Sequence, residues 1–185
     1  MPLEIEIKLK VDSHDPIRAH LRAAGATPHG KARETNIFFD RPDQSLRASD
    51  VGLRVRFTTK PDANEPVALL TLKQPPGKDL LNSREAFDLT LTPHDQIIPL
   101  LEALGFQQQI SFEKDRETWH LDHCLIELDT LPHFGDFVEI EGPSIEAVQQ
   151  VQSKLGLTSY PAHKDSYSKI VSQYLRQQNK RHLLF

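Results

Sequence analysis

The chain has 185 residues, 38% of them hydrophobic and 26% charged, so it is long enough for one globular domain with a sizeable core. Its net charge of −4 argues against binding to bulk nucleic acid, which needs a basic surface, and no apolar run approaches the length of a membrane span. The single cysteine, Cys124, excludes an internal disulfide, and the N-terminus does not resemble a signal peptide, so we expect a cytoplasmic protein.

The first predicted element is a strand over residues 3–11, in which apolar and charged residues alternate. Successive side chains of a strand point to opposite faces, so the five apolar residues share one face. The other face carries Glu4, Glu6, Lys8 and Lys10. Taken alone, this pattern is typical of a strand with one solvated face. A shared ligand is indicated only if later strands repeat it.

A short helix is expected next, with Ser13 or Asp15 as its N-cap and Gly25 at its end. A second strand is predicted at residues 35–40, and a polar loop follows it.

The alternation returns in a strand over residues 52–57, where Arg54 and Arg56 share one face and three apolar residues share the other. A turn rich in proline and aspartate leads to a strand at residues 67–73. There Lys73 lies on the face that also carries a threonine. The paired arginines match the spacing of the charges in the first strand.

The rest of the chain is predicted to contain four strands and three helices that begin near residues 92, 144 and 166. The strands are residues 84–91, 110–120, 124–130 and 136–142. The turns between the last three are short, which predicts antiparallel neighbours. Acids two residues apart recur in the last two strands, as Glu127 with Asp129 and Glu139 with Glu141.

Eight strand candidates with few helices predict an α+β fold, built as a closed or nearly closed barrel or as a two-layer sheet. No repeat or linker divides the chain. We therefore expect one domain over residues 1–178 and a tail over residues 179–185 that is open to disorder.

If the apolar faces pack against outer helices, the charged faces point inward. The acids are Glu4, Glu6, Glu127, Asp129, Glu139 and Glu141, and the bases are Lys8, Arg54, Arg56, Lys73, Lys114 and Arg116. Clustered carboxylates suit Mg²⁺ or Mn²⁺, and rows of arginine and lysine suit phosphate oxygens. The alternative is a set of solvated faces with surface ion pairs, which is strongest for Lys114 and Arg116 because both faces of their strand are charged.

The sequence Glu4-x-Glu6-x-Lys8 resembles the signature of the CYTH family, the triphosphate tunnel metalloenzymes. That family includes class IV adenylyl cyclases, thiamine triphosphatases and inorganic triphosphatases. Similar segments follow in the family's order over nearly the whole chain, at residues 52–56, 72–73, 114–116, 127–129, 135–141 and 164–167.

The resemblance implies an eight-stranded antiparallel β-barrel, or tunnel, with helices packed outside. Its acids would bind one or two Mg²⁺ or Mn²⁺ ions, and its basic residues would hold a triphosphate. The resemblance adds Lys164 to the substrate-binding residues, and it makes Glu4, Glu6 and Lys8 the candidate catalytic residues. Which of Arg84 and Glu85 faces inward stays open.

Three functions are compatible with these residues. The first is metal-dependent hydrolysis of tripolyphosphate, thiamine triphosphate or a nucleoside triphosphate, which we favour because no adenine-specific signature is present. The second is a class IV adenylyl cyclase that converts ATP to cyclic AMP and pyrophosphate. The third is a non-catalytic module that binds polyphosphate or nucleotide. The expected partner is a small-molecule triphosphate, without nucleic acid or membrane, and a homodimer is compatible with the sequence.

Overall fold

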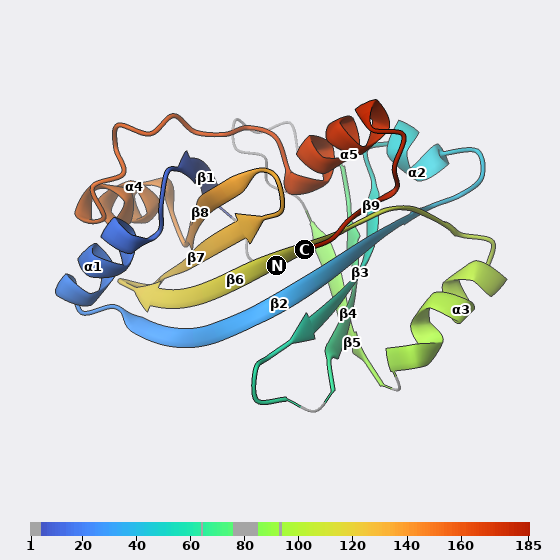
Figure 1. The fold of residues 1–185 in the computed structure, drawn as a ribbon, viewed down its shortest axis with the longest axis horizontal. Helices are drawn as coiled ribbons and strands as arrows, with labels where there is room; N and C mark the ends of the chain where they lie inside the picture. The colour runs from blue at the N-terminus through green and yellow to red at the C-terminus, as the bar shows by residue number, and fades with distance from the viewer. Residues whose placement is uncertain (1–4, 64, 76–84, 93) are drawn as a thin grey trace. The chain divides into compact units, whose positions relative to one another are not determined.

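The structure is a computed structural model that describes residues 5–63, 65–75, 85–92 and 94–185. The chain divides into two units. Unit 1 is Met1–Ala32 with Lys114–Asp165, and unit 2 is Arg33–Glu113 with Ser166–Phe185. Figure 1 labels the strands β1 to β9 and the helices α1 to α5.

The described residues contain nine strands that belong to one sheet. They are β1 (Ile5–Val11), β2 (Thr27–Asp40), β3 (Gly52–Thr59), β4 (Val67–Lys73), β5 (Ala86–Leu91), β6 (Gln107–Leu121), β7 (Cys124–Leu131), β8 (Gly135–Gly142) and β9 (His182–Leu183). Their hydrogen-bonded order is β1-β8-β7-β6-β2-β3-β4-β5, and β9 adds to β6. The ladders β1–β8, β8–β7, β7–β6, β2–β3, β3–β4 and β4–β5 are antiparallel.

An α+β fold with a large antiparallel sheet and few helices is therefore confirmed, but a closed barrel is not. Within the described ranges, β1 and β5 stand at the two ends of the strand order, and no ladder joins them. The number of strands and their direction also differ from the prediction, because β9 pairs with β6 in parallel. Residues 179–185 thus include a strand, and Leu183 in it is buried.

The helices are α1 (Asp15–Ala23), α2 (Ser45–Ala48), η1 (His94–Gln96), α3 (Ile97–Ala103), α4 (Ile145–Lys154) and α5 (Tyr167–Gln177). Serine side chains cap α4 and α5. Ser144 Oγ accepts a hydrogen bond from the Ala147 N–H at 3.1 Å, and Ser166 Oγ accepts one from the Lys169 N–H at 3.3 Å. In the described part of the chain, no helix has the length and apolar character needed to cross a membrane.

The start of α1 differs from the prediction. Its N-cap is His14, which makes no side-chain capping bond. The His14 ring is buried and its Nε2 pairs with the carbonyl oxygen of Phe137 at 2.9 Å. Ser13 Oγ instead accepts a hydrogen bond from the Asp15 N–H at 3.2 Å. His14 thus occupies the N-cap position while its side chain makes a tertiary contact instead of a cap.

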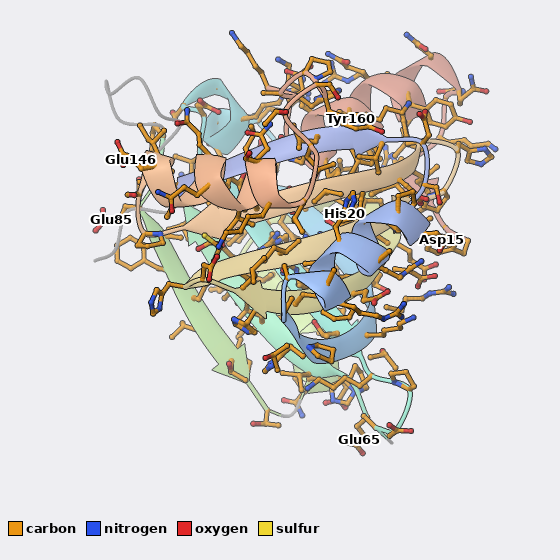
Figure 2. All side chains as sticks on the ribbon, turned by 90° about the vertical axis from the view of Figure 1, so that its left-hand side faces the viewer. Asp15, His20, Glu65, Glu85, Glu146 and Tyr160 are labelled. Carbon is orange, nitrogen blue, oxygen red and sulfur yellow. The ribbon has the colours of Figure 1, made fainter. Side chains whose placement is uncertain are left out.

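The core of unit 1 fixes which face of its strands is apolar. Helices α1 and α4 lie over β1, β7 and β8, on the side that faces the viewer in Figure 2. The cluster includes Leu9, Val11, Ile17, Leu21, Ile126, Leu128, Val138, Ile140, Val148 and Val151. Because side chains alternate along a strand, the opposite face carries Glu6, Lys8, Lys10, Glu127, Asp129, Glu139 and Glu141.

Unit 2 has a separate core on β2, β3, β4 and α3. Its buried members are Phe39, Leu53, Val55, Ala68, Ile97 and Leu101. Leu53 and Val55 alternate with Arg54 and Arg56 along β3. Burial of the two apolar residues therefore directs both arginines to the other face of the sheet, as the sequence predicts.

Candidate functional site

Strand register brings charged residues from distant parts of unit 1 onto one face. Lys8 lies opposite Glu139 in the β1–β8 ladder, and Glu139 lies opposite Glu127 in the β7–β8 ladder. Arg116 lies opposite Asp129 in the β6–β7 ladder. Side chains that are directly opposite in an antiparallel pair have Cβ atoms about 5 Å apart. Predicted cations and acids are thus neighbours across four strands.

Arg116 binds three of the predicted acids at once. Its Nε donates to Asp129 Oδ1 at 2.6 Å and its Nη2 to Asp129 Oδ2 at 2.6 Å, which makes a bidentate pair. Nη1 donates to Glu127 Oε1 at 2.5 Å, and Nη2 also donates to Glu139 Oε2 at 2.7 Å. Bidentate, charge-assisted bonds of this kind are strong and fix the planar guanidinium group.

Two lysines complete this cluster, the Arg116 network, defined as Lys8, Lys114, Arg116, Glu127, Asp129 and Glu139. Lys114 Nζ lies 3.0 Å from Asp129 Oδ2, and Lys8 Nζ lies 2.9 Å from Glu139 Oε1. The Asp129 side chain is 0% exposed and that of Lys114 is 2% exposed. Three cations thus balance three acids where water is almost excluded, which is the condition under which buried charge is tolerated.

The two acids of β7 in this network have shifted pKa values in opposite directions. Burial acts to raise the pKa of Asp129, but the adjacent Arg116 and Lys114 outweigh it and hold this pKa far below its usual range. Burial raises the pKa of Glu127 to about 7, although Arg116 and Lys114 act to lower it. The charges of Asp129 and Glu139 add to the rise. Burial thus dominates at Glu127, and the cations dominate at Asp129.

The raised pKa of Glu127 predicts that the metal-free protein becomes less stable as the pH rises from about 4.5 to about 7. Over this range Glu127 loses its proton in the unfolded chain but keeps it in the folded one. The contribution is complete below pH 4.5 and is lost as the pH passes the folded pKa. The difference between 4.5 and 7 is 2.5 pH units, which sets an upper limit of about 3 kcal/mol.

Urea unfolding in the presence of EDTA between pH 4.5 and 7.5 checks this prediction. The Glu127→Gln variant, whose side chain does not titrate, is expected to lack this part of the pH dependence. The pKa of Asp129 is lowered, so its contribution changes only below about pH 4 and does not mask the effect. Identical pH profiles for the wild type and the variant would contradict the assignment.

Glu6 and Glu141 lie beside the Arg116 network. They are directly opposite in the β1–β8 ladder, and Glu6 is exposed while Glu141 is half-buried. Glu4 lies outside the described residues. Within those residues no group of three or more His, Cys, Asp or Glu side chains is arranged to hold a metal ion. Three of the predicted ligands are bound to Arg116 instead, so the predicted metal site stays a prediction.

In unit 2, the paired arginines contact side chains of the neighbouring strands. Arg54 Nη2 donates to Thr71 Oγ1 at 3.3 Å. Arg56 Nε donates to Asn36 Oδ1 at 3.0 Å, and Arg56 Nη1 lies 3.3 Å from Glu34 Oε1. Both arginines are therefore held on the face opposite the core of this unit.

Of the other predicted basic residues, Lys73 lies at the end of a strand and Lys164 lies in the segment that precedes α5. Lys73 is the last residue of β4, half-buried and opposite Gly52. Lys164 is exposed in unit 1 and follows His163, whose main-chain N–H donates to the carbonyl oxygen of Lys8 at 2.7 Å. This bond places the segment before α5 alongside β1. Arg84 lies outside the described residues, and Glu85 is exposed (Figure 2).

Three polar residues of unit 2 were missed in the sequence, namely Glu34, Asn36 and Thr71. Glu34 and Asn36 are two residues apart, which is the same spacing as in the predicted charged pairs. The predicted strand began at Thr35, however, so Glu34 fell outside it. Thr71 is neutral, and only its position opposite Arg54 gives it a role.

A family model described as the CYTH domain matches residues 2–174. A Methanocaldococcus jannaschii protein described as a candidate adenylate cyclase, MJ0240, is 25% identical over 139 residues, which cover 75% of this chain and 76% of that protein.

Two solved structures share the fold. PH1819 from Pyrococcus horikoshii OT3 is 23% identical, has a TM-score of 0.78, and is matched over 92% of this chain and 99% of its own. HpAC1 from Hippeastrum, described as a candidate adenylyl cyclase with a dominant triphosphatase activity, is 20% identical with a TM-score of 0.68. The match covers 97% of both chains.

Proposed function

The chain belongs to the CYTH domain family, and from this premise we propose that it hydrolyses a triphosphate with the help of a divalent metal ion. Members of the family are adenylyl cyclases or triphosphatases, so an enzymatic activity on a triphosphate is expected. The observation that carries the proposal is the Arg116 network, in which cations suited to phosphate and acids suited to metal lie within bonding distance of one another.

We propose Mg²⁺ or Mn²⁺ as the metal, held by carboxylates of β1, β7 and β8. The donor chemistry fits, because these ions prefer oxygen ligands and because Glu6 and Glu141 face each other in register. Glu4, Glu139 and Glu127 complete the set that we propose. Asp129 is better suited to anchoring Arg116 and Lys114, since its oxygens are already bound and it is fully buried. When bound, the metal would neutralise phosphate charge and polarise the phosphorus.

The protein's own cations are proposed to bind the phosphate oxygens. Lys8 and Arg116 both contact Glu139, so a phosphate group that binds there competes with this carboxylate for two cations. Arg54 and Arg56 supply a second pair of cations in unit 2. Fixed cations of this kind stabilise the negative charge that develops on a transferred phosphoryl group.

The adenylyl cyclase reaction is the second candidate, favoured by the M. jannaschii relative and its description as a candidate adenylate cyclase. In that reaction the ribose 3′-hydroxyl of ATP attacks the α-phosphate, and pyrophosphate leaves. The dominant triphosphatase activity described for the Hippeastrum protein favours hydrolysis. Both reactions use the same charged groups and differ in which phosphorus atom is attacked.

Product analysis distinguishes the candidates. The protein is incubated with tripolyphosphate, thiamine triphosphate and ATP, each with Mg²⁺ or Mn²⁺ and each repeated in EDTA. Orthophosphate that forms only with metal supports the triphosphatase. Cyclic AMP with pyrophosphate supports the cyclase. Tight binding of a triphosphate without turnover would overturn both and indicate a non-catalytic binding module.

Arg54→Ala and Arg56→Ala are each expected to weaken the binding of tripolyphosphate by about 1.5–3 kcal/mol, the value of a hydrogen bond to a charged group. Isothermal titration calorimetry checks this prediction. Arg22→Ala is the control, because Arg22 is an exposed residue of α1 outside the proposed site. Unchanged affinity in both variants would mean that these arginines do not bind the phosphates.

A further inference from the structure

Arg56 is held by the side chain that lies directly opposite it in the sheet. Asn36 is its register partner in the β2–β3 ladder, and the Asn36 Oδ1 atom accepts the hydrogen bond from Arg56 Nε. Glu34, two residues earlier on the same face of β2, lies beside Arg56 Nη1. Asn36 is 1% exposed and Glu34 is 4% exposed. Two of the three guanidinium nitrogens are therefore fixed by side chains that water scarcely reaches.

The contact with Arg56 also fixes the orientation of the Asn36 amide. A guanidinium group only donates hydrogen bonds, so the amide oxygen must face it and Nδ2 must point elsewhere. Asn36 Nδ2 is buried, and it has no hydrogen-bond partner in the described part of the chain. A buried donor without a partner is destabilising, because it has lost its hydrogen bonds to water and gained none in return. An aspartate at this position would accept the same bond from Arg56 without leaving a donor unsatisfied.

What the amide provides, and a carboxylate would not, is neutrality. Arg56, Glu34 and Asn36 together have a formal charge of zero. With an aspartate at position 36, the formal charge of the three residues would be −1. Such a site would repel a polyanion. The Arg116 network shows the other arrangement, in which one guanidinium contacts three carboxylates.

Arg54 is held in a similar way. Its register partner in the β3–β4 ladder is Thr71, whose hydroxyl accepts the hydrogen bond from Arg54 Nη2. Thr71 is also buried, and its own hydroxyl donates to Asp88 Oδ1 at 2.5 Å. A neutral side chain thus lies opposite each arginine of β3, on a different neighbouring strand in each case.

We propose that Asn36 is a positioning residue, which orients the Arg56 guanidinium without neutralising it so that Nη2 binds a phosphate oxygen of the triphosphate. This inference rests on the proposed function, in which Arg56 binds phosphate. It assigns to Asn36 a role that is separate from stability and that explains why an incompletely bonded amide occupies a buried position.

The test is the affinity for tripolyphosphate, measured by calorimetry without metal. Asn36→Leu has nearly the same size but removes the acceptor, and it is expected to weaken binding about tenfold or more. In an Arg56→Ala background the same substitution is expected to change the affinity less than twofold, because Asn36 acts through Arg56. The matched control is Thr35→Val, since Thr35 directly precedes Asn36 in β2 and points to the opposite face.

Asn36→Asp is the second variant, and it keeps a polar partner for Arg56 in case Asn36→Leu does not fold. It preserves the orientation but adds a negative charge. Its loss of affinity is expected to be large in 50 mM NaCl and to shrink in 500 mM NaCl, because salt screens the added repulsion. A loss that does not depend on salt would overturn the role of neutrality.

Three outcomes separate this inference from the function on which it rests. Wild-type binding of tripolyphosphate together with unchanged binding by Asn36→Leu overturns the inference alone. The same is true if the losses from Asn36→Leu and Arg56→Ala multiply in the double variant. Failure of the folded wild type to bind tripolyphosphate overturns both.

Discussion

Replacing Arg116 with alanine is expected to lower the free energy of unfolding of the metal-free protein by about 3–5 kcal/mol, the cost of removing one partner from a buried ion pair. Asp129 would keep only Lys114 as a cationic partner in the Arg116 network while remaining fully buried. Glu127 and Glu139 would lose their contacts with the guanidinium at the same time. Urea unfolding at pH 7 measures the effect.

The control is an ion pair at the surface. Lys154 pairs with Asp122, and both side chains are about half exposed. Lys154→Ala is therefore expected to cost no more than about 1 kcal/mol. A loss below 1 kcal/mol for Arg116→Ala as well would mean that water reaches the carboxylates of the network. Burial would then not be the property that distinguishes the two pairs.

Glu6→Gln is expected to lower metal-dependent triphosphate turnover about 100-fold or more, because loss of even an outer partner of a metal ligand costs 10–100-fold. The fold should be retained, since Glu6 is exposed and lies on the face opposite the core of unit 1. Turnover is measured with Mg²⁺ and Mn²⁺ over a range of concentrations, and stability by urea unfolding. We expect the same loss of turnover for Glu4→Gln. This expectation rests on the sequence, because Glu4 lies outside the residues that the structure describes.

Glu146→Gln is the matched control for this substitution. Glu146 is also an exposed glutamate of unit 1, but it lies on α4, on the helical side of the sheet (Figure 2). Its variant is expected to turn over triphosphate at the wild-type rate. Wild-type turnover in Glu6→Gln with metal present would remove Glu6 from the proposed metal site.

Strands with one apolar face were predictable from the sequence, because burial of that face imposes a period of two. Residues 67–73 form β4 as predicted, and β3, β7 and β8 differ from their predictions by at most two residues. The strand β2 begins at Thr27, eight residues earlier than predicted. Its first part contains Pro28 and Gly30 and is mostly exposed, so no apolar alternation reveals it. A two-residue strand such as β9 has no period at all.

For the site, spacing along the chain predicted which charges share a face of a strand but not which charges meet. That Lys8 contacts Glu139, and Arg116 contacts Asp129, depends on strand order and register. Both are set by packing between segments that are far apart in the sequence. The neutral residues Asn36 and Thr71 could not be predicted, because their importance comes only from the arginine that each faces.

The pairing of β1 with β8 has a consequence for the order of folding. In unit 1, β6–β7 and β7–β8 are joined by short turns, whereas β1 is separated from β8 by more than a hundred residues. Local pairs form faster because less chain entropy is lost in closing them. In unit 1, β1 comes before β6, β7 and β8 in the chain and is therefore synthesised before them. Because its partner β8 is so distant in the sequence, we expect β1 to pair last. An unpaired strand promotes aggregation unless charges interrupt it. The alternating charges of β1 are of the kind that limits the aggregation of an unpaired strand.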